Sequence, residues 1–182
     1  MKIAITGHTK GLGLEFAKCL ELRGHQIQGF SRSNGYDLRN WAKMQKMLSE
    51  IADFDMLISC AKPDYVQTVL LYEAFKAWKG LPKTILNISS ILTYYTAMPA
   101  ELSSDVMMHF YKNTKNSLNQ ACVELSTLSA EPKIMLVKPG HLYSQQITEA
   151  EQARLTAWVN FLLDSIEQAQ TLGFTIKEIT LE

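Results

Sequence analysis

Short apolar runs alternate along the chain with stretches of helical periodicity, and this alternation constrains the fold more than any other feature of the sequence. Apolar runs bounded by turn residues predict strands at 2–6, 26–30, 54–59, 83–89, 133–138 and 174–181, with a very short additional strand at 36–38. Helical patterns lie between these runs and predict helices at 11–23, 41–51, from Pro63 to Gly80, 104–128 and 148–171. Strands that alternate with helices in this way favour a parallel sheet covered by helices on both faces.

The predicted architecture is therefore an α/β fold of the Rossmann type, a doubly wound parallel sheet in three layers, α/β/α. The 182 residues contain no repeat, low-complexity segment or linker, so residues 1–182 are expected to form a single domain. Ligands of such sheets bind beyond the carboxyl ends of the strands, near the point where the strand order reverses.

The charge balance and the spacing of reactive residues exclude several classes of function. Lys plus Arg and Asp plus Glu number 18 each, so no bulk charge attracts nucleic acid or an anionic membrane. No apolar run approaches the roughly 20 residues that span a bilayer, and the first strand leaves no room for a signal peptide. Three scattered cysteines suggest a reducing compartment, and four scattered histidines show no metal-ligand spacing. We expect a cytoplasmic protein with no nucleic-acid or membrane partner and no metal.

A glycine-rich turn connects the first predicted strand to the first predicted helix, with the sequence Thr6-Gly7-His8-Thr9-Lys10-Gly11-Leu12-Gly13. A phosphate group needs exposed backbone amides and a helix N-terminus that points toward it. Glycines allow the sharp turn and the close approach of the phosphate, because they carry no Cβ. In this strand–turn–helix context, the turn predicts binding of a dinucleotide.

The spacing Thr-Gly-x-x-x-Gly-x-Gly resembles the cofactor turn of the short-chain dehydrogenase/reductase family. Members of that family carry a catalytic Ser at the end of the fifth strand and a Tyr-x-x-x-Lys motif on the next helix. Here Ser89 and Ser90 close a strand, and Tyr111 and Lys115 follow on the long helix, one turn apart on the same face. A second copy, Tyr72-x-x-x-Lys76, precedes the serine strand, so its order does not fit the family and a helix-surface pair is expected there.

Further similarities follow in sequence order over nearly the whole chain. Pro139-Gly140 resembles the family's turn near the nicotinamide, with Ser144 where a Thr is common. The segment Ser59-Cys60-Ala61-Lys62 stands in place of Asn-Asn-Ala-Gly and retains only the Ala. Asp37-Leu38 resembles the Asp-Val pair whose carboxylate faces the adenine amino group.

The sequence also departs from the family pattern in the substrate region. Few residues separate Arg32 from Asp37, so a second crossover helix is missing, and the fourth helix is expected to be short. The family's relay Asn has no counterpart, since no Asn lies between Ala61 and Gly80. The loop at 91–110 is longer than usual, and its role as a substrate lid or as a spacer is open.

The end of the second strand favours NADP(H) as the cofactor, with NAD(H) as the alternative. An acid there would bind free ribose hydroxyls, whereas Phe30-Ser31-Arg32-Ser33 offers a cation and hydroxyls suited to a 2′-phosphate. Lys10 resembles the basic residue found in the glycine turn of NADP-preferring relatives. The predicted cofactor-binding residues are Gly7, Thr9, Lys10, Gly11, Leu12, Gly13, Ser31, Arg32, Asp37, Leu38, Ala61, Tyr111, Lys115, Pro139 and Gly140.

The resemblance implies hydride transfer that interconverts a carbonyl and an alcohol of a small-molecule substrate. It assigns Tyr111 as the general acid/base, Lys115 as the group that lowers the tyrosine pKa and holds the ribose hydroxyls, and Ser90 as the hydrogen-bond donor to the carbonyl oxygen. Ser89 is the alternative to Ser90. The competing hypothesis is a dinucleotide-binding sensor or regulator with weak or no turnover, and pairing into a homodimer is left open.

Overall fold

The chain folds around one parallel sheet. The computed structural model describes residues 1–61, 64–140 and 148–181, and these residues form a six-stranded sheet in the order β2-β1-β3-β4-β5-β6. The strands are β1 (Lys2–Thr6), β2 (Gln26–Phe30), β3 (Met56–Ser59), β4 (Thr84–Ile88), β5 (Lys133–Pro139) and β6 (Glu178–Leu181). The α-helices are α1 (Gly11–Leu22), α2 (Trp41–Glu50), α3 (Val66–Trp78), α4 (Val106–Leu128) and α5 (Glu149–Thr171). Short 3₁₀ turns are η1 (Arg32–Asn34), η2 (Ile91–Tyr94) and η3 (Ala100–Leu102).

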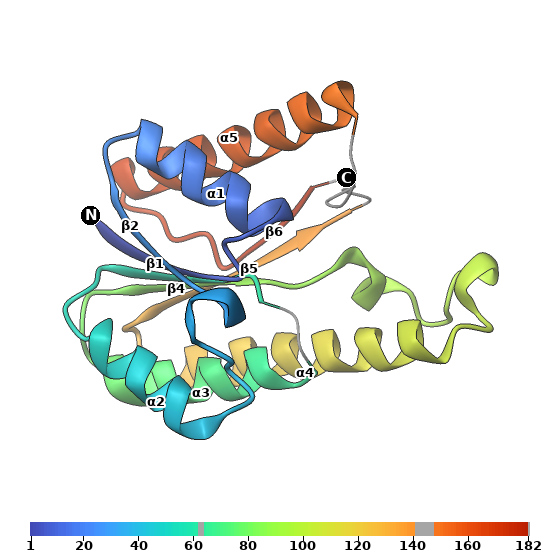
Figure 1. The fold of residues 1–182 in the computed structure, drawn as a ribbon, viewed down its shortest axis with the longest axis horizontal. Helices are drawn as coiled ribbons and strands as arrows, with labels where there is room; N and C mark the ends of the chain where they lie inside the picture. The colour runs from blue at the N-terminus through green and yellow to red at the C-terminus, as the bar shows by residue number, and fades with distance from the viewer. Residues whose placement is uncertain (62–63, 141–147, 182) are drawn as a thin grey trace.

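The helices cover both faces of the sheet and bury two separate apolar layers. Figure 1 shows α1 and α5 on one face and α2, α3 and α4 on the other. Because successive strand residues point to opposite faces, Ala4 and Leu57 pack toward α2–α4, whereas Ile5 and Ile58 pack toward α1 and α5. The predicted three-layer Rossmann-type fold is confirmed.

The strand order reverses between β1 and β3. After β1 the chain passes through α1 to β2 on one side, and α2 then carries it back across to β3 on the other side. Thr6, the last residue of β1, is in register with Phe30 of β2 and with Ser59 of β3. The carboxyl ends of these strands therefore meet at the switch point, where open α/β sheets bind ligands.

The short strand predicted at 36–38 is wrong, because these residues form a loop. The Tyr36 hydroxyl donates to the Glu50 carboxylate of α2 at 2.6 Å, and the Arg39 guanidinium donates to the Asp37 carboxylate at 2.7 Å. Leu38 is buried in the core beneath α2. These side-chain contacts direct the segment into α2 instead of along the edge of β2. As predicted, no crossover helix lies between Arg32 and Asp37, where the chain forms only the short turn η1; the crossover from β2 to β3 is made by α2.

The last predicted strand, 174–181, is shorter in the structure. Pairing with β5 begins where Glu178 comes into register with Leu136, so β6 contains only Glu178–Leu181.

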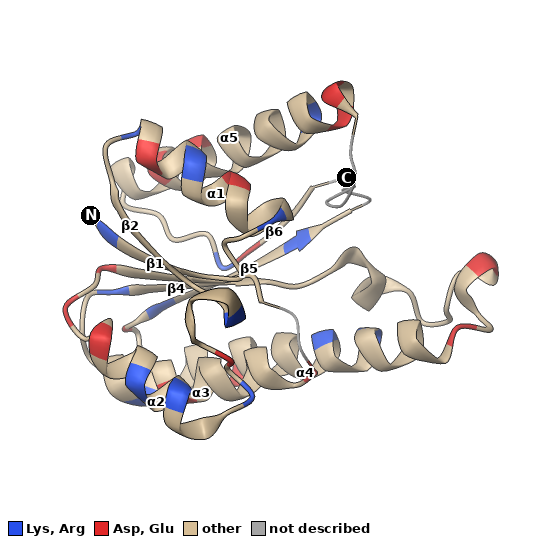
Figure 2. Cartoon of the chain, viewed as in Figure 1, with Lys and Arg blue, Asp and Glu red and all other residues tan. Residues whose placement is uncertain are grey.

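Charged side chains are dispersed over the described part of the molecule. Figure 2 shows Lys and Arg positions interleaved with Asp and Glu positions on the helices and loops. None of the described helices has the length and the apolar character needed to cross a membrane.

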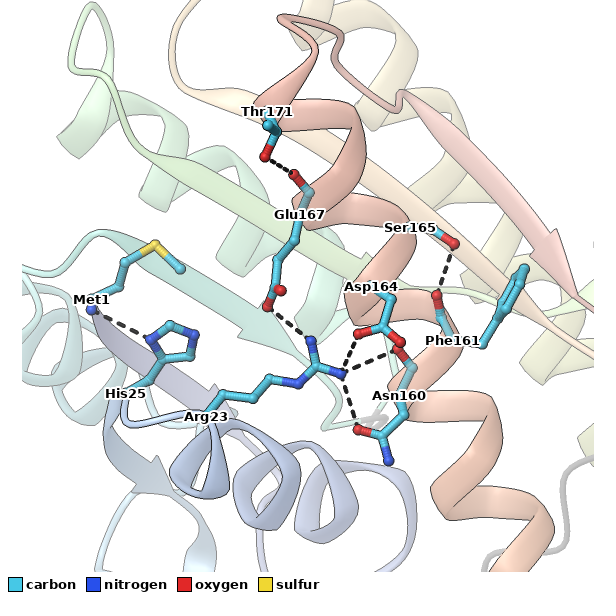
Figure 3. A network of polar contacts seen from close by, with 9 residues as sticks. All are labelled: Met1, Arg23, His25, Asn160, Phe161, Asp164, Ser165, Glu167 and Thr171. Carbon is cyan, nitrogen blue, oxygen red and sulfur yellow. Dashed lines mark hydrogen bonds and ion pairs between the residues drawn. The ribbon is translucent and has the colours of Figure 1, made fainter.

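Polar contacts join the end of α1 to the middle of α5, as Figure 3 shows. Arg23 follows α1, and its guanidinium donates to the Asp164 carboxylate at 2.7 Å and to the Glu167 carboxylate at 2.9 Å. The same group donates to the Asn160 side-chain oxygen at 3.0 Å. One arginine therefore binds three successive turns of the facing helix.

We expect Arg23→Met to lower the free energy of unfolding by about 1 to 2 kcal/mol, because the carboxylates of α5 lose a charged donor at a partly buried position. Urea unfolding monitored by circular dichroism measures this change. Lys18→Met, on an exposed position of α1, is the control and should change stability by less than about 0.5 kcal/mol. Equal stability of the two variants would contradict the role given to Arg23.

Candidate functional site

A cleft of about 580 Å³ opens at the carboxyl ends of the central strands. It is lined by every residue that the sequence predicted as binding or catalytic: Gly7, Thr9, Lys10, Gly11, Leu12, Gly13, Ser31, Arg32, Asp37, Leu38, Ala61, Ser90, Tyr111, Lys115, Pro139 and Gly140. Sequence reasoning did not select Phe30, Tyr36, Cys60 or Ile88, which also line the cleft. Phe30 and Ile88 end β2 and β4, Cys60 directly follows β3, and Tyr36 lies in the loop between β2 and α2. Only the assembled fold brings them to the cleft.

The glycine turn packs backbone against backbone at the floor of the cleft. Gly7 has a φ of +73°, and a Cβ on it would lie 3.0 Å from the Ala61 backbone. A Cβ on Gly13 would lie 2.4 Å from the Gly7 carbonyl oxygen. The Thr6 hydroxyl oxygen accepts hydrogen bonds from the backbone amides of Cys60 and Ala61, each at 3.2 Å, and fixes the end of β1 to the end of β3. The packing of the turn itself therefore requires glycine at both positions, and the turn lies at the N-terminus of α1, where backbone amides and the helix dipole favour an anion.

The segment that follows β2 is shaped by its own hydrogen bonds. The Ser31 and Ser33 hydroxyls are 2.8 Å apart, and the Asn34 side-chain amide donates to the Gly29 carbonyl oxygen at 2.7 Å. Asn34 also accepts a hydrogen bond from the Ser31 backbone amide at 2.8 Å. These contacts leave the exposed Arg32 at the rim of the cleft.

Asp37 lies at the same rim, and its carboxylate accepts hydrogen bonds from the Arg39 guanidinium. Hydrogen bonds from Arg39 lower the pKa of Asp37 to about 2, and the positive charge of Arg32 acts in the same direction. The carboxylate is therefore charged at neutral pH, which keeps it a hydrogen-bond acceptor.

Ser90, Tyr111 and Lys115 meet at the other end of the cleft. Ser90 directly precedes η2, and its hydroxyl forms a hydrogen bond with Tyr111 on α4. The Lys115 ammonium lies 5.4 Å from the centre of the Tyr111 ring. Burial raises the pKa of the Tyr111 phenol, and the hydrogen bond with Ser90 lowers it in part. Since the net direction is upward, the phenol is protonated at neutral pH and can donate a proton. Lys115 is not among the groups that shift this pKa, so the lowering by Lys115 that the resemblance implied is not seen.

Lys115 is almost fully buried, with 3% of its surface exposed. Its ammonium donates to the Ile88 carbonyl oxygen at 2.8 Å and to the side-chain oxygen of Gln67 on α3. Sequence reasoning missed Gln67, because only an Asn was sought in this part of the chain. A glutamine one helical turn before Leu70 and Leu71, on the face of α3 that is otherwise apolar and buried, is the signal that could have identified it.

The alternative residues weighed from the sequence have other contacts. The Ser89 hydroxyl donates to the Asn119 side chain at 2.6 Å, while Ser90 pairs with Tyr111. In the second Tyr-x-x-x-Lys copy, the Tyr72 hydroxyl donates to Glu124 of α4 at 3.1 Å, and this copy does not line the cleft. As expected, it lies on a helix surface.

The long connection between β4 and α4 forms hydrogen bonds with β6 and with α4. The Tyr94 hydroxyl contacts the Thr180 hydroxyl of β6 at 2.9 Å, and Lys112 donates to the Tyr95 carbonyl oxygen. Residues 91–110 are all described, and none of them lines the cleft. The structure therefore favours a spacer over a lid.

Other sequence expectations concern the remaining reactive residues. Burial raises the pKa of the Cys60 thiol to about 12, so this cysteine is a thiol and not a thiolate at neutral pH. Among residues 1–61, 64–140 and 148–181, no group of His, Cys, Asp and Glu side chains is arranged to hold a metal ion. Lys62 and Ser144 lie outside the described residues.

Comparisons with known proteins agree with this geometry at the level of fold. No family model and no curated protein matches the sequence. Among solved structures, a short-chain dehydrogenase/reductase from Vibrio parahaemolyticus is similar with a TM-score of 0.74 and 17% identity, over 98% of this chain and 98% of that one. A short-chain dehydrogenase from Burkholderia cenocepacia in complex with NADP has a TM-score of 0.71 and 15% identity, over 100% of this chain and 87% of that one.

A third similar structure was determined with the other nicotinamide cofactor. The 3-alpha-hydroxysteroid dehydrogenase of a Pseudomonas species, complexed with NADH, has a TM-score of 0.60 and 15% identity, over 85% of this chain and 80% of that one. The chain has the fold of the short-chain dehydrogenases. The fold that the sequence motifs implied is thus confirmed.

Proposed function

We propose that residues 1–182 form a dinucleotide-binding domain that acts as an NADP(H)-dependent oxidoreductase on a small carbonyl or alcohol substrate. One observation carries the proposal: a single cleft joins the glycine turn after β1 to Ser90, Tyr111 and Lys115. The neighbours solved with NADP and NADH support a nicotinamide dinucleotide as the ligand.

The chain's own residues suit the two ends of such a dinucleotide. The backbone around Gly7 and Gly13 would receive the diphosphate at the N-terminus of α1, where the helix dipole favours negative charge. The rim with Ser31 and Arg32 would receive the adenosine end. The bound nicotinamide would supply the hydride that converts a carbonyl to an alcohol.

Three side chains at the far end of the cleft would handle the proton and the carbonyl oxygen. The protonated phenol of Tyr111 would donate its proton to the oxygen as negative charge develops there, and Ser90 would hydrogen-bond the same oxygen. Lys115 would stabilise the phenolate that remains, because a positive charge nearby favours the ionised form. This division of roles accounts for the contacts of Tyr111 with both neighbours.

We expect Arg32→Ala to weaken binding of NADPH by roughly 10- to 100-fold and to leave NADH binding nearly unchanged, because a charged hydrogen bond contributes about 1.5 to 3 kcal/mol. Only NADPH carries the 2′-phosphate that the guanidinium would bind. Fluorescence titration with each dinucleotide measures both constants. Lys43→Ala, an exposed position on α2 outside the cleft, is the control. Equal weakening for NADPH and NADH would contradict the preference for NADP(H).

Two measurements on the purified protein test the function itself. A rise in melting temperature with NADPH establishes binding, because a ligand selective for the folded state raises its apparent stability. Oxidation of NADPH is then followed with a panel of aldehydes and ketones. Binding without turnover would identify the chain as a sensor instead of an enzyme.

The expected cytoplasmic location and pairing into a homodimer stay predictions.

A further inference from the structure

Gln67 connects the ends of two strands to the buried lysine of the cleft. It lies in the first turn of α3 and is 95% buried, since 5% of its surface is exposed. Its side-chain nitrogen donates to the Ser59 carbonyl oxygen at 2.7 Å and to the Ile88 carbonyl oxygen at 3.2 Å. Its side-chain oxygen accepts a hydrogen bond from Lys115. One amide therefore joins β3, β4, α3 and α4 beneath the cleft.

The orientation of this amide is determined by its partners. Carbonyl oxygens only accept hydrogen bonds, so the Gln67 nitrogen must face Ser59 and Ile88. The Gln67 oxygen then faces Lys115, whose ammonium only donates. The reverse orientation would place oxygen against two carbonyl oxygens and nitrogen against a cation. No other arrangement of the side chain satisfies these three partners.

The Ile88 carbonyl closes a small hydrogen-bonded ring with Gln67 and Lys115. Its oxygen has two lone pairs and accepts from the Lys115 ammonium at 2.8 Å as well as from Gln67. Ile88 is the last residue of β4 and lies two positions before Ser90. The ammonium is thus held relative to the strand that carries the serine, at 5.4 Å from the Tyr111 ring centre.

A buried ammonium is stable only where acceptors replace the lost water. Gln67 and the Ile88 carbonyl provide two acceptors without a negative charge, so they fix the position of Lys115 without neutralising it. An aspartate or glutamate in this place would attract the lysine more strongly, but its negative charge would offset the positive charge that the phenolate of Tyr111 needs. The choice of a neutral amide thus preserves the electrostatic role of Lys115.

We propose that Gln67 is a positioning residue. The side-chain oxygen of Gln67 holds the Lys115 ammonium beside Tyr111, and the side-chain nitrogen of Gln67 binds the ends of β3 and β4. The proposal rests on the proposed function, because the position of Lys115 affects turnover only if a dinucleotide and a carbonyl compound react in this cleft. Gln67 itself does not line the cleft.

The first test is a double-mutant cycle on turnover. Gln67→Met keeps the length of the side chain and should lower kcat by about 100-fold, the loss typical of a catalytic group displaced by roughly 1 Å. In a Lys115→Met background the same change should have little further effect, because Gln67 acts through Lys115. A further 100-fold loss in that background would overturn the proposal, since it would show an effect that does not pass through the lysine.

Lys83→Met is the matched control for lost stability. The Lys83 ammonium donates to the Ala52 and Phe54 carbonyl oxygens at 2.6 and 2.7 Å, at the opposite end of β4 from Ile88. This variant also loses two hydrogen bonds to backbone carbonyls, but it should retain the kcat of the unmodified protein. A similar fall in kcat for Lys83→Met and Gln67→Met would overturn the proposal, because general destabilisation would explain both.

The second test does not depend on turnover. In ¹⁵N-lysine NMR of the protein without ligand, the Lys115 ammonium should give a signal from slowly exchanging protons, assigned by its loss in Lys115→Met. Gln67→Met should remove this signal, whereas the control variant Lys83→Met should retain it. An unchanged signal in Gln67→Met would overturn the proposal. If the protein neither bound nor oxidised NADPH, the proposed function would fail while the NMR result still decided whether Gln67 holds Lys115.

Discussion

Tyr111→Phe is expected to lower the rate of carbonyl reduction by about 10²- to 10⁴-fold, the usual contribution of a positioned proton donor. The substitution removes only the hydroxyl, which forms the hydrogen bond with Ser90, and keeps the ring that lies near Lys115. Because the glycine turn and the rim at Arg32 are untouched, the dissociation constant of NADPH should change little. Steady-state kinetics and fluorescence titration give the two quantities.

The chain contains a matched control for this experiment. Tyr72 belongs to the other Tyr-x-x-x-Lys copy, and its hydroxyl donates a hydrogen bond to Glu124 of α4. Tyr72→Phe should therefore retain the kcat and the NADPH affinity of the unmodified protein. If Tyr111→Phe turned over as fast as Tyr72→Phe, Tyr111 would not be the acid/base.

Gly13→Ala is expected to weaken NADPH binding by about tenfold or more and to lower the free energy of unfolding by about 1 to 3 kcal/mol. The added Cβ would lie 2.4 Å from the Gly7 carbonyl oxygen and 2.9 Å from the Gly7 carbonyl carbon. Both contacts are with backbone atoms, so the turn must shift as a whole and its amides move away from the diphosphate. Urea unfolding and fluorescence titration measure the two effects.

Gly24→Ala separates the loss of stability from the loss of binding. Gly24 has a φ of +81°, and a Cβ there would meet no atom within 4 Å. The substitution should cost about 1 to 2 kcal/mol of stability, because the left-handed conformation is unfavourable for alanine. It should leave NADPH affinity unchanged, since Gly24 follows the far end of α1. Unchanged NADPH affinity in Gly13→Ala would contradict the role of the glycine turn.

Apart from residues 36–38, the order and type of the elements could be predicted from the sequence. The period of two in the strands, the period of 3.6 in the helices and the glycines that end them are local patterns, and they decide local structure. The same locality explains the success at the glycine turn, since Gly7 and Gly13 meet within one strand–turn–helix unit. The family resemblance, together with the order of the motifs along the chain, was enough to select Ser90, Tyr111 and Lys115, which line one cleft in the structure.

The failures occurred where contacts between distant segments decide the outcome. Residues 36–38 look like a strand, but the hydrogen bond from Tyr36 to Glu50 and the burial of Leu38 under α2 turn them into a loop. No local pattern contains the information that α2 returns over this segment. Similarly, the loop at 91–110 could not be assigned until Tyr94 was seen to contact Thr180 of the last strand.

The sequence by itself determined the α/β class and the glycine turn, because each depends on short-range periodicity or on one strand–turn–helix unit. The family resemblance of its motifs selected most of the residues that line the cleft. Only the tertiary structure revealed Gln67, whose partners Ser59, Ile88 and Lys115 are 8, 21 and 48 positions away in the chain. A buried glutamine has no preferred partner in sequence. Its hydrogen bonds are decided by which donors and acceptors the packed strands and helices bring within 3 Å or so of its amide.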